Sequence, residues 1–256
     1  MKVLICGKGG SGKSTVSALI AKSLKKSGYR VLLVDADESN FGLHRLMGIE
    51  PPVNLMENLG GKRGFKEKIK PAFPGESPQG IFPEGMDSEK IPEECISRSD
   101  GIRLLVIGKI HDFGEGCACP MGMLSKMVLS RLSVGDDEIV IIDTEAGVEH
   151  FGRRLDAECD LILGVIDPTY ESFMLSARML EMAREAGTEI FFVLNKVEDS
   201  VAEAMSRNLD QERIIARIPK DDRIFMDSLE GRKLTAEIEG IEDIRRAIEA
   251  YKYPGP

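Results

Sequence analysis

The fold of this chain is decided by the stretch Gly7-Lys8-Gly9-Gly10-Ser11-Gly12-Lys13-Ser14-Thr15. The apolar residues 3–6 precede it, and an amphipathic pattern over residues 16–24 follows it. This strand–loop–helix order is the setting that the phosphate-binding motif G-x-x-x-x-G-K-[ST] requires. Glycines carry no Cβ atom, so successive backbone N–H groups can curl around phosphate oxygens. A glycine-rich turn that binds no ligand is the alternative.

Two lysines give this stretch its charge. We expect the amine of Lys13 to reach the β- and γ-phosphates of a nucleotide. Ser14 begins a helix whose dipole is positive at this end, and its hydroxyl is expected to hold Mg²⁺. The general motif leaves the position of Lys8 free. A lysine there places a second cation at the nucleotide, points outward to a partner, or is an ordinary solvated surface lysine.

The composition indicates a globular α/β protein. With 256 residues, 42% of them hydrophobic, the chain suits one large P-loop domain over residues 1–256. The net charge of −9 argues against a nucleic-acid partner, which needs a basic stripe. There is no charged-then-apolar leader and no apolar run of membrane-spanning length, so we expect a cytoplasmic protein with no membrane partner. In a reducing compartment its five cysteines are expected to be thiols or metal ligands.

Continuous apolar runs predict the strands of a central sheet. They occupy residues 3–6, 30–34, 102–108, 138–143, 160–166, 189–194 and 214–218. A run that is apolar throughout is typical of parallel strands covered on both faces. Helical patterns lie between or after them at residues 13–28, 121–132, 171–186 and 241–251. The predicted fold class is therefore α/β, a three-layer sandwich with a mostly parallel central sheet flanked by helices on both faces, as in P-loop NTPases.

Carboxylates follow two of these strands. In open parallel sheets, ligands bind outside the carboxyl ends of the strands. Asp35 and Asp37 lie at such an end and could orient Mg²⁺-bound water and an attacking water, or could simply form a turn. Asp143 begins a D-x-x-x-G pattern that ends at Gly147. We expect Asp143 to bind Mg²⁺ through water and the Gly147 N–H to sense the γ-phosphate.

Asn195 and Lys196 follow the predicted strand at 189–194. An asparagine there can offer both an amide donor and a carbonyl acceptor to the edge of an adenine. Asn195 and Lys196 are therefore expected on the nucleotide-binding surface.

Residues 60–101 differ from the rest of the chain. Glycine and proline recur through this stretch and break any long periodic element. We interpret it as an irregular excursion with room for a short hairpin, not as a second domain. An ordered loop of this length is uncommon unless it is functional. Two roles are therefore open for it: contact with a partner, or a cover over the site.

Cys117 and Cys119 form a C-x-C pair before a helical pattern. A disulfide between them would close a small, strained ring. As thiolates they can bind one metal ion together, but two sulfurs leave a tetrahedral site half filled. A two-fold axis would supply the other two sulfurs, and the following helix N-terminus would lower the thiol pKa. Two incidental residues in a loop are the alternative. The remaining cysteines, Cys6, Cys95 and Cys159, are expected to be small hydrophobic residues.

The loop pattern G-K-G-G-x-G-K-[ST] resembles the deviant phosphate loop of the family that holds MinD, ParA and the nitrogenase iron protein. The resemblance implies an ATPase, with ATP or ADP and Mg²⁺ as ligands. It implies that Lys8 crosses a dimer interface to the other subunit's nucleotide, and that Asp37 positions the hydrolytic water. Lys8, Lys13 and Asp37 are then the catalytic residues. Asp35 would lie near the metal, and Pro219 against the base.

Within that family the chain is most similar to nickel-insertion ATPases that mature carbon monoxide dehydrogenase, the CooC type. The likeness is carried by Cys117-Ala118-Cys119, by the run Asp143-Thr144-Glu145-Ala146-Gly147-Val148-Glu149-His150, and by Val165-Ile166-Asp167-Pro168. It implies an ATP- or metal-bound homodimer, Ni²⁺ or Zn²⁺ at a shared four-cysteine site, and a nickel enzyme such as carbon monoxide dehydrogenase as client. The phosphate loop departs from the family at Ser11 and Ser14, where valine and threonine are common.

Two other functions remain open. The first is a redox role with an iron–sulfur cluster between subunits, as in the nitrogenase iron protein. The second is a partner-binding, positioning role like that of MinD or ParA. The acidic charge and the mixed charges of the predicted last helix argue against the DNA and membrane surfaces of the second class.

Overall fold

The computed structural model describes residues 1–70, 81–110, 119–148 and 155–253. Within them, eight strands form one sheet in the order β10-β9-β8-β1-β7-β2-β5-β4. These are β1 (Lys2–Gly7), β2 (Arg30–Ala36), β4 (Ile96–Ser99), β5 (Ile102–Val106), β7 (Glu138–Thr144), β8 (Leu161–Ile166), β9 (Glu189–Val197) and β10 (Ile214–Pro219). All neighbours pair in parallel except β4, which is antiparallel to β5. The predicted, mostly parallel α/β sheet is confirmed.

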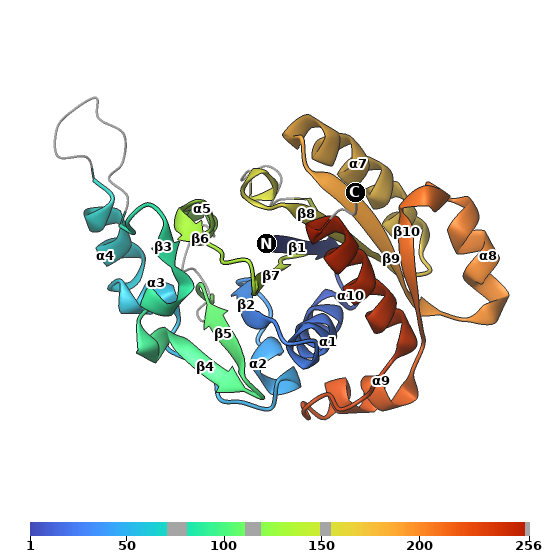
Figure 1. Cartoon of the computed structure of the whole chain (residues 1–256), viewed down its shortest axis with the longest axis horizontal. Helices are drawn as coiled ribbons and strands as arrows, with labels where there is room; N and C mark the ends of the chain where they lie inside the picture. The colour runs from blue at the N-terminus through green and yellow to red at the C-terminus, as the bar shows by residue number, and fades with distance from the viewer. Residues whose placement is uncertain (71–80, 111–118, 149–154, 254–256) are drawn as a thin grey trace.

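Helices cover both faces of this sheet (Figure 1). On one face lie α1 (Lys13–Lys26) and α10 (Glu239–Lys252), and on the other lie α5 (Cys119–Arg131) and α7 (Tyr170–Ala186). The other helices in the described residues are shorter: α2 (Leu43–Leu46), α3 (Leu55–Asn58), α4 (Gly61–Lys68), α8 (Asp199–Arg207) and α9 (Asp222–Leu229). None of the helices in the described ranges has the length and apolarity that crossing a membrane would need.

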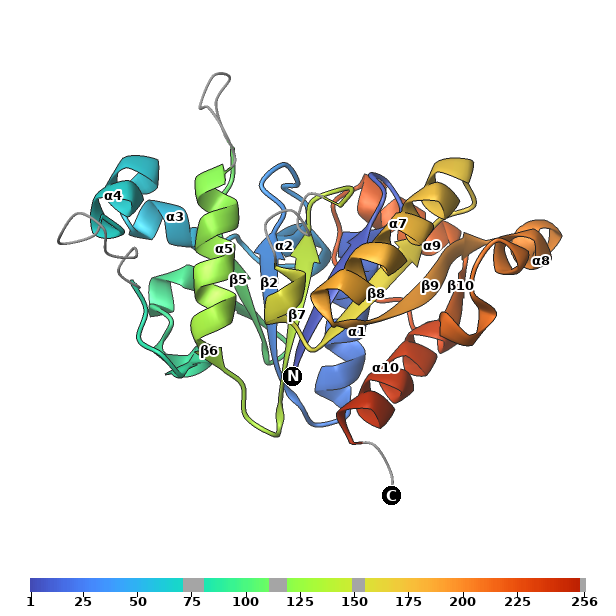
Figure 2. The ribbon, with the colours of Figure 1, turned by 90° about the horizontal axis from the view of Figure 1, so that it is seen from above.

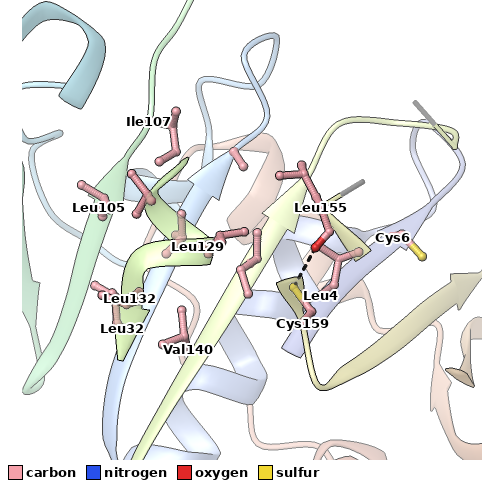
Figure 3. Close-up of a cluster of buried hydrophobic side chains, with 14 of the residues drawn as sticks. Leu4, Cys6, Leu32, Leu105, Ile107, Leu129, Leu132, Val140, Leu155 and Cys159 are labelled. Carbon is pink, nitrogen blue, oxygen red and sulfur yellow. Dashed lines mark hydrogen bonds between the residues drawn. The ribbon is translucent and has the colours of Figure 1, made fainter. Parts of the chain in front are cut away.

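The core consists of two apolar clusters, one on each face of the sheet. In β1, Leu4 and Cys6 belong to the cluster under α5 and α7, whereas Val3 and Ile5 belong to the cluster under α1 and α10. Successive side chains of a strand point to opposite faces, and both sets are completely buried because helices cover both faces. The middle of such a strand therefore has to be apolar on both faces. Figure 3 shows the first cluster, in which Cys159 donates a hydrogen bond to the Leu155 carbonyl at 3.3 Å.

The helix boundaries follow local chemistry. α7 is capped at its start by Thr169, whose hydroxyl accepts a hydrogen bond from the Ser172 N–H. It ends at Gly187, which adopts the left-handed conformation (φ 74°) that glycine accommodates without strain. α10 buries Ile241, Ile244 and Ile248, a 3–4 spacing that gives the helix one apolar face.

The stretch 60–101 contains more regular structure than its glycines and prolines predict. Its described residues include α4, the short strand β3 (Met86–Asp87), two 3₁₀ turns and β4. β3 pairs with β6 (Leu132–Ser133), and the hairpin β4–β5 turns at Asp100 and Gly101, which both have positive φ. Phe65 is fully buried, so this segment packs onto the first apolar cluster.

The carboxyl ends of the parallel strands lie along one edge of the sheet. Figure 2 shows the arrowheads of β2 and β7 at this edge. Because β1, β7 and β2 are adjacent, the loops that follow Gly7, Thr144 and Ala36 meet there. The sequence motifs singled out above are therefore brought together by the sheet.

Candidate nucleotide-binding site

The loop after β1 has a backbone that only glycine can follow at key points. Gly7, Gly10 and Gly12 have φ of 150°, 77° and 98°, all in the region that disfavours side chains. A Cβ on Gly7 would collide with the Val165 carbonyl, and one on Gly12 would collide with the Asn195 amide. This loop is therefore specified both by backbone conformation and by close neighbours.

Lys13 begins α1 directly after this loop. Its Nζ donates to the Lys8 carbonyl at 3.3 Å, and the Ser11 N–H donates to the same oxygen at 3.1 Å. The amine thus lies across the loop, and the residue is only 7% exposed. A cation in this position faces the place where the loop N–H groups would surround phosphate oxygens.

Ser14 and Asp143 form a pair between α1 and the end of β7. The Ser14 Oγ donates to Asp143 Oδ2 at 2.6 Å, and the Ser17 Oγ donates to Oδ1 at 3.1 Å. Asp143 is fully buried, and this burial raises the pKa of its carboxyl to about 6, against the effects of Ser14 and Lys13. A buried carboxylate beside a hydroxyl fits Mg²⁺, which proteins bind through one or two carboxylates plus substrate phosphates.

Asp35 and Asp37, at the end of β2, have different hydrogen-bond partners. Asp35 lies opposite Asp143 in the sheet, and both of its oxygens are 2.8 Å from the amine of Lys109. Burial raises the pKa of Asp35 to about 7 despite that ion pair. Asp37 Oδ1 accepts hydrogen bonds from the Ser39 N–H and hydroxyl and from the Asn40 N–H. One aspartate is thus held by a lysine, and the other orders the turn 37–40.

Lys8 forms an ion pair within its own chain. Its Nζ lies 3.5 Å from Asp167 Oδ2 and 3.8 Å from Glu171 Oε2. The lysine side chain is 25% exposed, and the Asp167 side chain only 9%. Lys8 therefore stays close to the end of β8, near the surface.

Gly147, which ends the D-x-x-x-G pattern, is hydrogen-bonded to the phosphate loop. The Gly147 N–H donates to the Gly7 carbonyl at 3.1 Å, which forms an isolated bridge between the two segments. In this structure the N–H that we expect to sense the γ-phosphate is therefore occupied by the loop.

Asn195 and Lys196 also contact the loop. The Asn195 Nδ2 donates to the Ser11 carbonyl at 2.7 Å, and the Lys196 Nζ donates to the Gly10 carbonyl at 2.6 Å. Asn195, Lys196 and Pro219 line the same cavity of about 970 Å³, together with Gly9, Gly10, Gly12, Lys13, Ser14 and Thr15. A cavity of this volume is within the range of small-molecule and cofactor sites.

The structure describes only one of the two cysteines of the C-x-C pair. Cys117 lies outside the described residues. Cys119 is exposed, begins α5, and is disulfide-bonded in this structure. A metal-binding thiolate at this position therefore belongs to the reduced protein. Cys6, Cys95 and Cys159 are buried and free, as the sequence predicts. In the described ranges, no three His, Cys, Asp or Glu residues are grouped as a metal site.

Three residues of this region were missed as contributors to the site. Lys109 pairs with Asp35, Asn40 donates from Nδ2 to the Ser14 Oγ at 2.7 Å, and Asp167 pairs with Lys8. Each lies at or just beyond the end of a strand or in the loop that follows it, so position along the strands is the signal that could have found them. Knowing which strands are neighbours was the missing information.

A glycine-rich loop between strand and helix, a lysine over it, and a buried Ser–Asp pair beside it define a P-loop ATPase of the MinD/ParA type. The family model described as "CobQ/CobB/MinD/ParA nucleotide binding domain" matches residues 2–234. The chain belongs to this family.

Individual relatives agree with this assignment. An uncharacterized ATP-binding protein of Methanocaldococcus jannaschii is 44% identical over 95% of this chain and 98% of its own. The carbon monoxide dehydrogenase accessory protein CooC of Rhodospirillum rubrum is 32% identical, with 88% of this chain and 85% of its own length covered. Among solved structures, the septum site-determining protein MinD of Pyrococcus horikoshii, complexed with Mg-ADP, has a TM-score of 0.68 at 18% identity and covers 97% of this chain and 95% of its own. That structural likeness concerns the fold.

Proposed function

We propose that this protein is an ATP-dependent metallochaperone whose ATP-bound dimer assembles a four-cysteine metal site. ATP hydrolysis would support insertion of nickel into carbon monoxide dehydrogenase or a related nickel enzyme. The observation that carries the proposal is the position of Cys119, which is exposed at the start of α5. Helix α5 packs on the sheet beside β2 and β7 (Figure 2). The 32% identity with CooC supports the choice of client.

The chain's own residues would divide the work of hydrolysis. Lys13 and Lys8 neutralise phosphate charge, Lys8 by leaving Asp167 and crossing to the partner's nucleotide. Ser14 and Asp143 hold Mg²⁺, which stabilises the negative charge that develops on the phosphates. Asp37 holds the attacking water in line with the γ-phosphate, and its ordered turn supports this role.

Closing of the dimer would bring two copies of Cys117 and Cys119 together. Four thiolates would complete the tetrahedral shell that Zn²⁺ takes from sulfur ligands, and they would supply four donors to Ni²⁺, whose preferred geometry differs. Opening after hydrolysis would halve that shell, and the ion could pass to the client. Metal binding and ATP-driven dimerisation must then strengthen each other to the same extent.

The test is metal-dependent dimerisation of the reduced protein, measured by analytical ultracentrifugation with a phosphine reductant present. We expect Zn²⁺ or Ni²⁺ to shift the wild type toward dimer. We expect Cys117→Ala and Cys119→Ala to abolish that shift while ATP still binds. Cys95→Ala, at a buried cysteine outside the C-x-C pair, is the matched control and should respond like the wild type. One metal ion per dimer at wild-type affinity in Cys119→Ala would refute the assignment.

A further inference from the structure

Lys109 holds the segment that follows β2. Its amine lies 2.8 Å from the Asp35 carboxylate and 2.5 Å from the Asp37 carbonyl, and it also donates to the Asn40 carbonyl. The Lys109 side chain is only 8% exposed. An ammonium group has three donors, and here all three are used within six residues of chain. Lys109 therefore fixes the start, middle and end of the turn at 35–40.

Backbone hydrogen bonds extend this contact beyond the sheet. The Ile107 N–H donates to the Asp35 carbonyl at 3.0 Å, and the Ile110 N–H donates to the Glu38 carbonyl at 3.1 Å. Residues 107–110, which follow β5, consequently run beside residues 35–38 at the end of β2 and just beyond it. Movement of one segment must either move the other or break these bonds.

The turn at 35–40 also contacts the proposed Mg²⁺ ligands. Asn40, whose carbonyl accepts from Lys109, donates from its side chain to the Ser14 Oγ at 2.7 Å. Ser14 in turn donates to Asp143 at 2.6 Å. Asn40 therefore contacts both Ser14 and Lys109, so a change at Ser14 when Mg²⁺ and ATP bind can reach Lys109 through this one residue.

The other side of residues 107–110 packs against α5. A Cβ built on Gly108 would lie 3.1 Å from the Met56 Cβ and 3.3 Å from the Met121 Cγ, so the backbone of Gly108 approaches both side chains closely. Met121 is 3% exposed and lies two residues after Cys119 on the first turn of α5. A shift of Gly108 is thus passed to the end of α5 that carries Cys119, because close-packed atoms leave no slack.

We propose that Lys109 is a positioning residue that couples the turn at 35–40, which contacts the proposed nucleotide and Mg²⁺ ligands, to Cys119 at the start of α5. The inference rests on the proposed function, since it supplies the path by which ATP binding would reach the metal site. This coupling requires two conformations of the turn at 35–40, which differ in how residues 107–110 pack against Met121.

The experiment measures a ratio of affinities in the reduced protein. The dissociation constant of a non-hydrolysable ATP analogue is determined without and with saturating Zn²⁺, and the quotient is the coupling. We expect a wild-type quotient in the range of about 5 to 150 that is typical of allosteric pairs, and a quotient within about threefold of one for Lys109→Met. Simple loss of stability would lower both affinities together and leave the quotient unchanged. Lys66→Met, an exposed lysine on α4, is the matched control and should keep the wild-type quotient.

A second variant tests the α5 side without removing the ion pair. Met121→Ala should leave binding of the analogue alone unchanged and lower the quotient as Lys109→Met does. Wild-type quotients in both variants, with a clear wild-type coupling, would overturn this inference and leave the proposed function standing. A quotient of one in the wild type itself would contradict both the inference and the proposed function.

Discussion

At the scale of single residues, Lys8 stands out because the family resemblance and the structure give it different partners. The resemblance sends its amine across a dimer interface, whereas here it pairs with Asp167 at 3.5 Å and, less closely, with the exposed Glu171. Both can hold if the intrachain pair is the state that must be left before the dimer closes. The pair would then oppose dimerisation by its own free energy, about 0 to 1 kcal/mol for an ion pair near the surface.

Asp167→Asn tests this idea with little other disturbance. Asp167 Oδ1 accepts from the Thr169 and Ser172 hydroxyls, and an asparagine Oδ1 can keep both bonds while its amide replaces Oδ2, which faces Lys8. We expect dimerisation in the presence of an ATP analogue to strengthen, by up to about fivefold. Sedimentation velocity at several concentrations measures it. Glu171→Gln should change it less, because Glu171 is farther from Lys8 and 81% exposed. Weaker dimerisation of Asp167→Asn would show that this carboxylate does not restrain Lys8.

At the scale of elements, the end of β9 acts as a support for the phosphate loop. Asn195 and Lys196 each donate to a loop carbonyl, at 2.7 and 2.6 Å. Lys196 has φ of 58°, an uncommon conformation for a residue other than glycine. Two consecutive carbonyls of the loop, at Gly10 and Ser11, are therefore turned toward β9. Fixing these peptide planes helps the loop keep its shape.

This geometry gives Asn195 a second candidate role beside base recognition, and one variant separates them. Asn195→Ala would leave the Ser11 carbonyl without its donor, which typically costs about 1–3 kcal/mol, so we expect nucleotide affinity to fall about 5- to 100-fold. If Asn195 supports the loop, ATP and GTP analogues should weaken equally in a fluorescence titration. If it reads adenine, the preference for ATP over GTP should shrink. Asn208→Ala on the exposed end of α8 removes a similar amide bond far from the loop and should change neither affinity.

At the scale of the whole molecule, the sheet could be predicted because its strands are buried on both faces. The middle of such a strand is apolar on both faces, and the runs within β1, β2, β7 and β8 show this directly. The site could be predicted as far as it is carried by contiguous motifs at strand ends. Helix α9 could not be predicted in this way, because none of its residues is fully buried. α4 was hidden among glycines, with Phe65 as its single buried side chain.

The contacts of Lys109 show a different limit. Its partner Asp35 is 74 residues away in sequence, and they meet only because β5 lies beside β2. Periodicity identifies a strand but not its neighbours, so no pattern in the sequence places this amine on that carboxylate. The same holds for Lys8 and Asp167, which meet because β1 lies beside β8.

The four cysteines that the structure describes divide into two groups with different surroundings. Cys6, Cys95 and Cys159 are buried in the first apolar cluster. Burial raises the pKa of the Cys6 thiol to about 12 and that of Cys95 to about 11, and it raises the pKa of Cys159 further. Only the thiolate attacks an alkylating reagent, so these three are protected both by exclusion of the reagent and by protonation. Cys119 is exposed, so the reagent can reach its thiol once it is reduced.

We therefore expect iodoacetamide at pH 8 to modify the native, reduced protein at Cys119 within minutes, and Cys6, Cys95 and Cys159 only as fast as the molecule unfolds. Peptide mass spectrometry after a timed quench measures this, and denaturant, in which every cysteine should react, is the control. Zn²⁺ with an ATP analogue should protect Cys119, because a thiolate bound to metal in a closed dimer is neither free nor accessible. Neither ligand alone should protect it as strongly, since closing and metal binding support each other. Equal labelling of Cys119 under all four conditions would mean that nucleotide and metal do not meet at this cysteine.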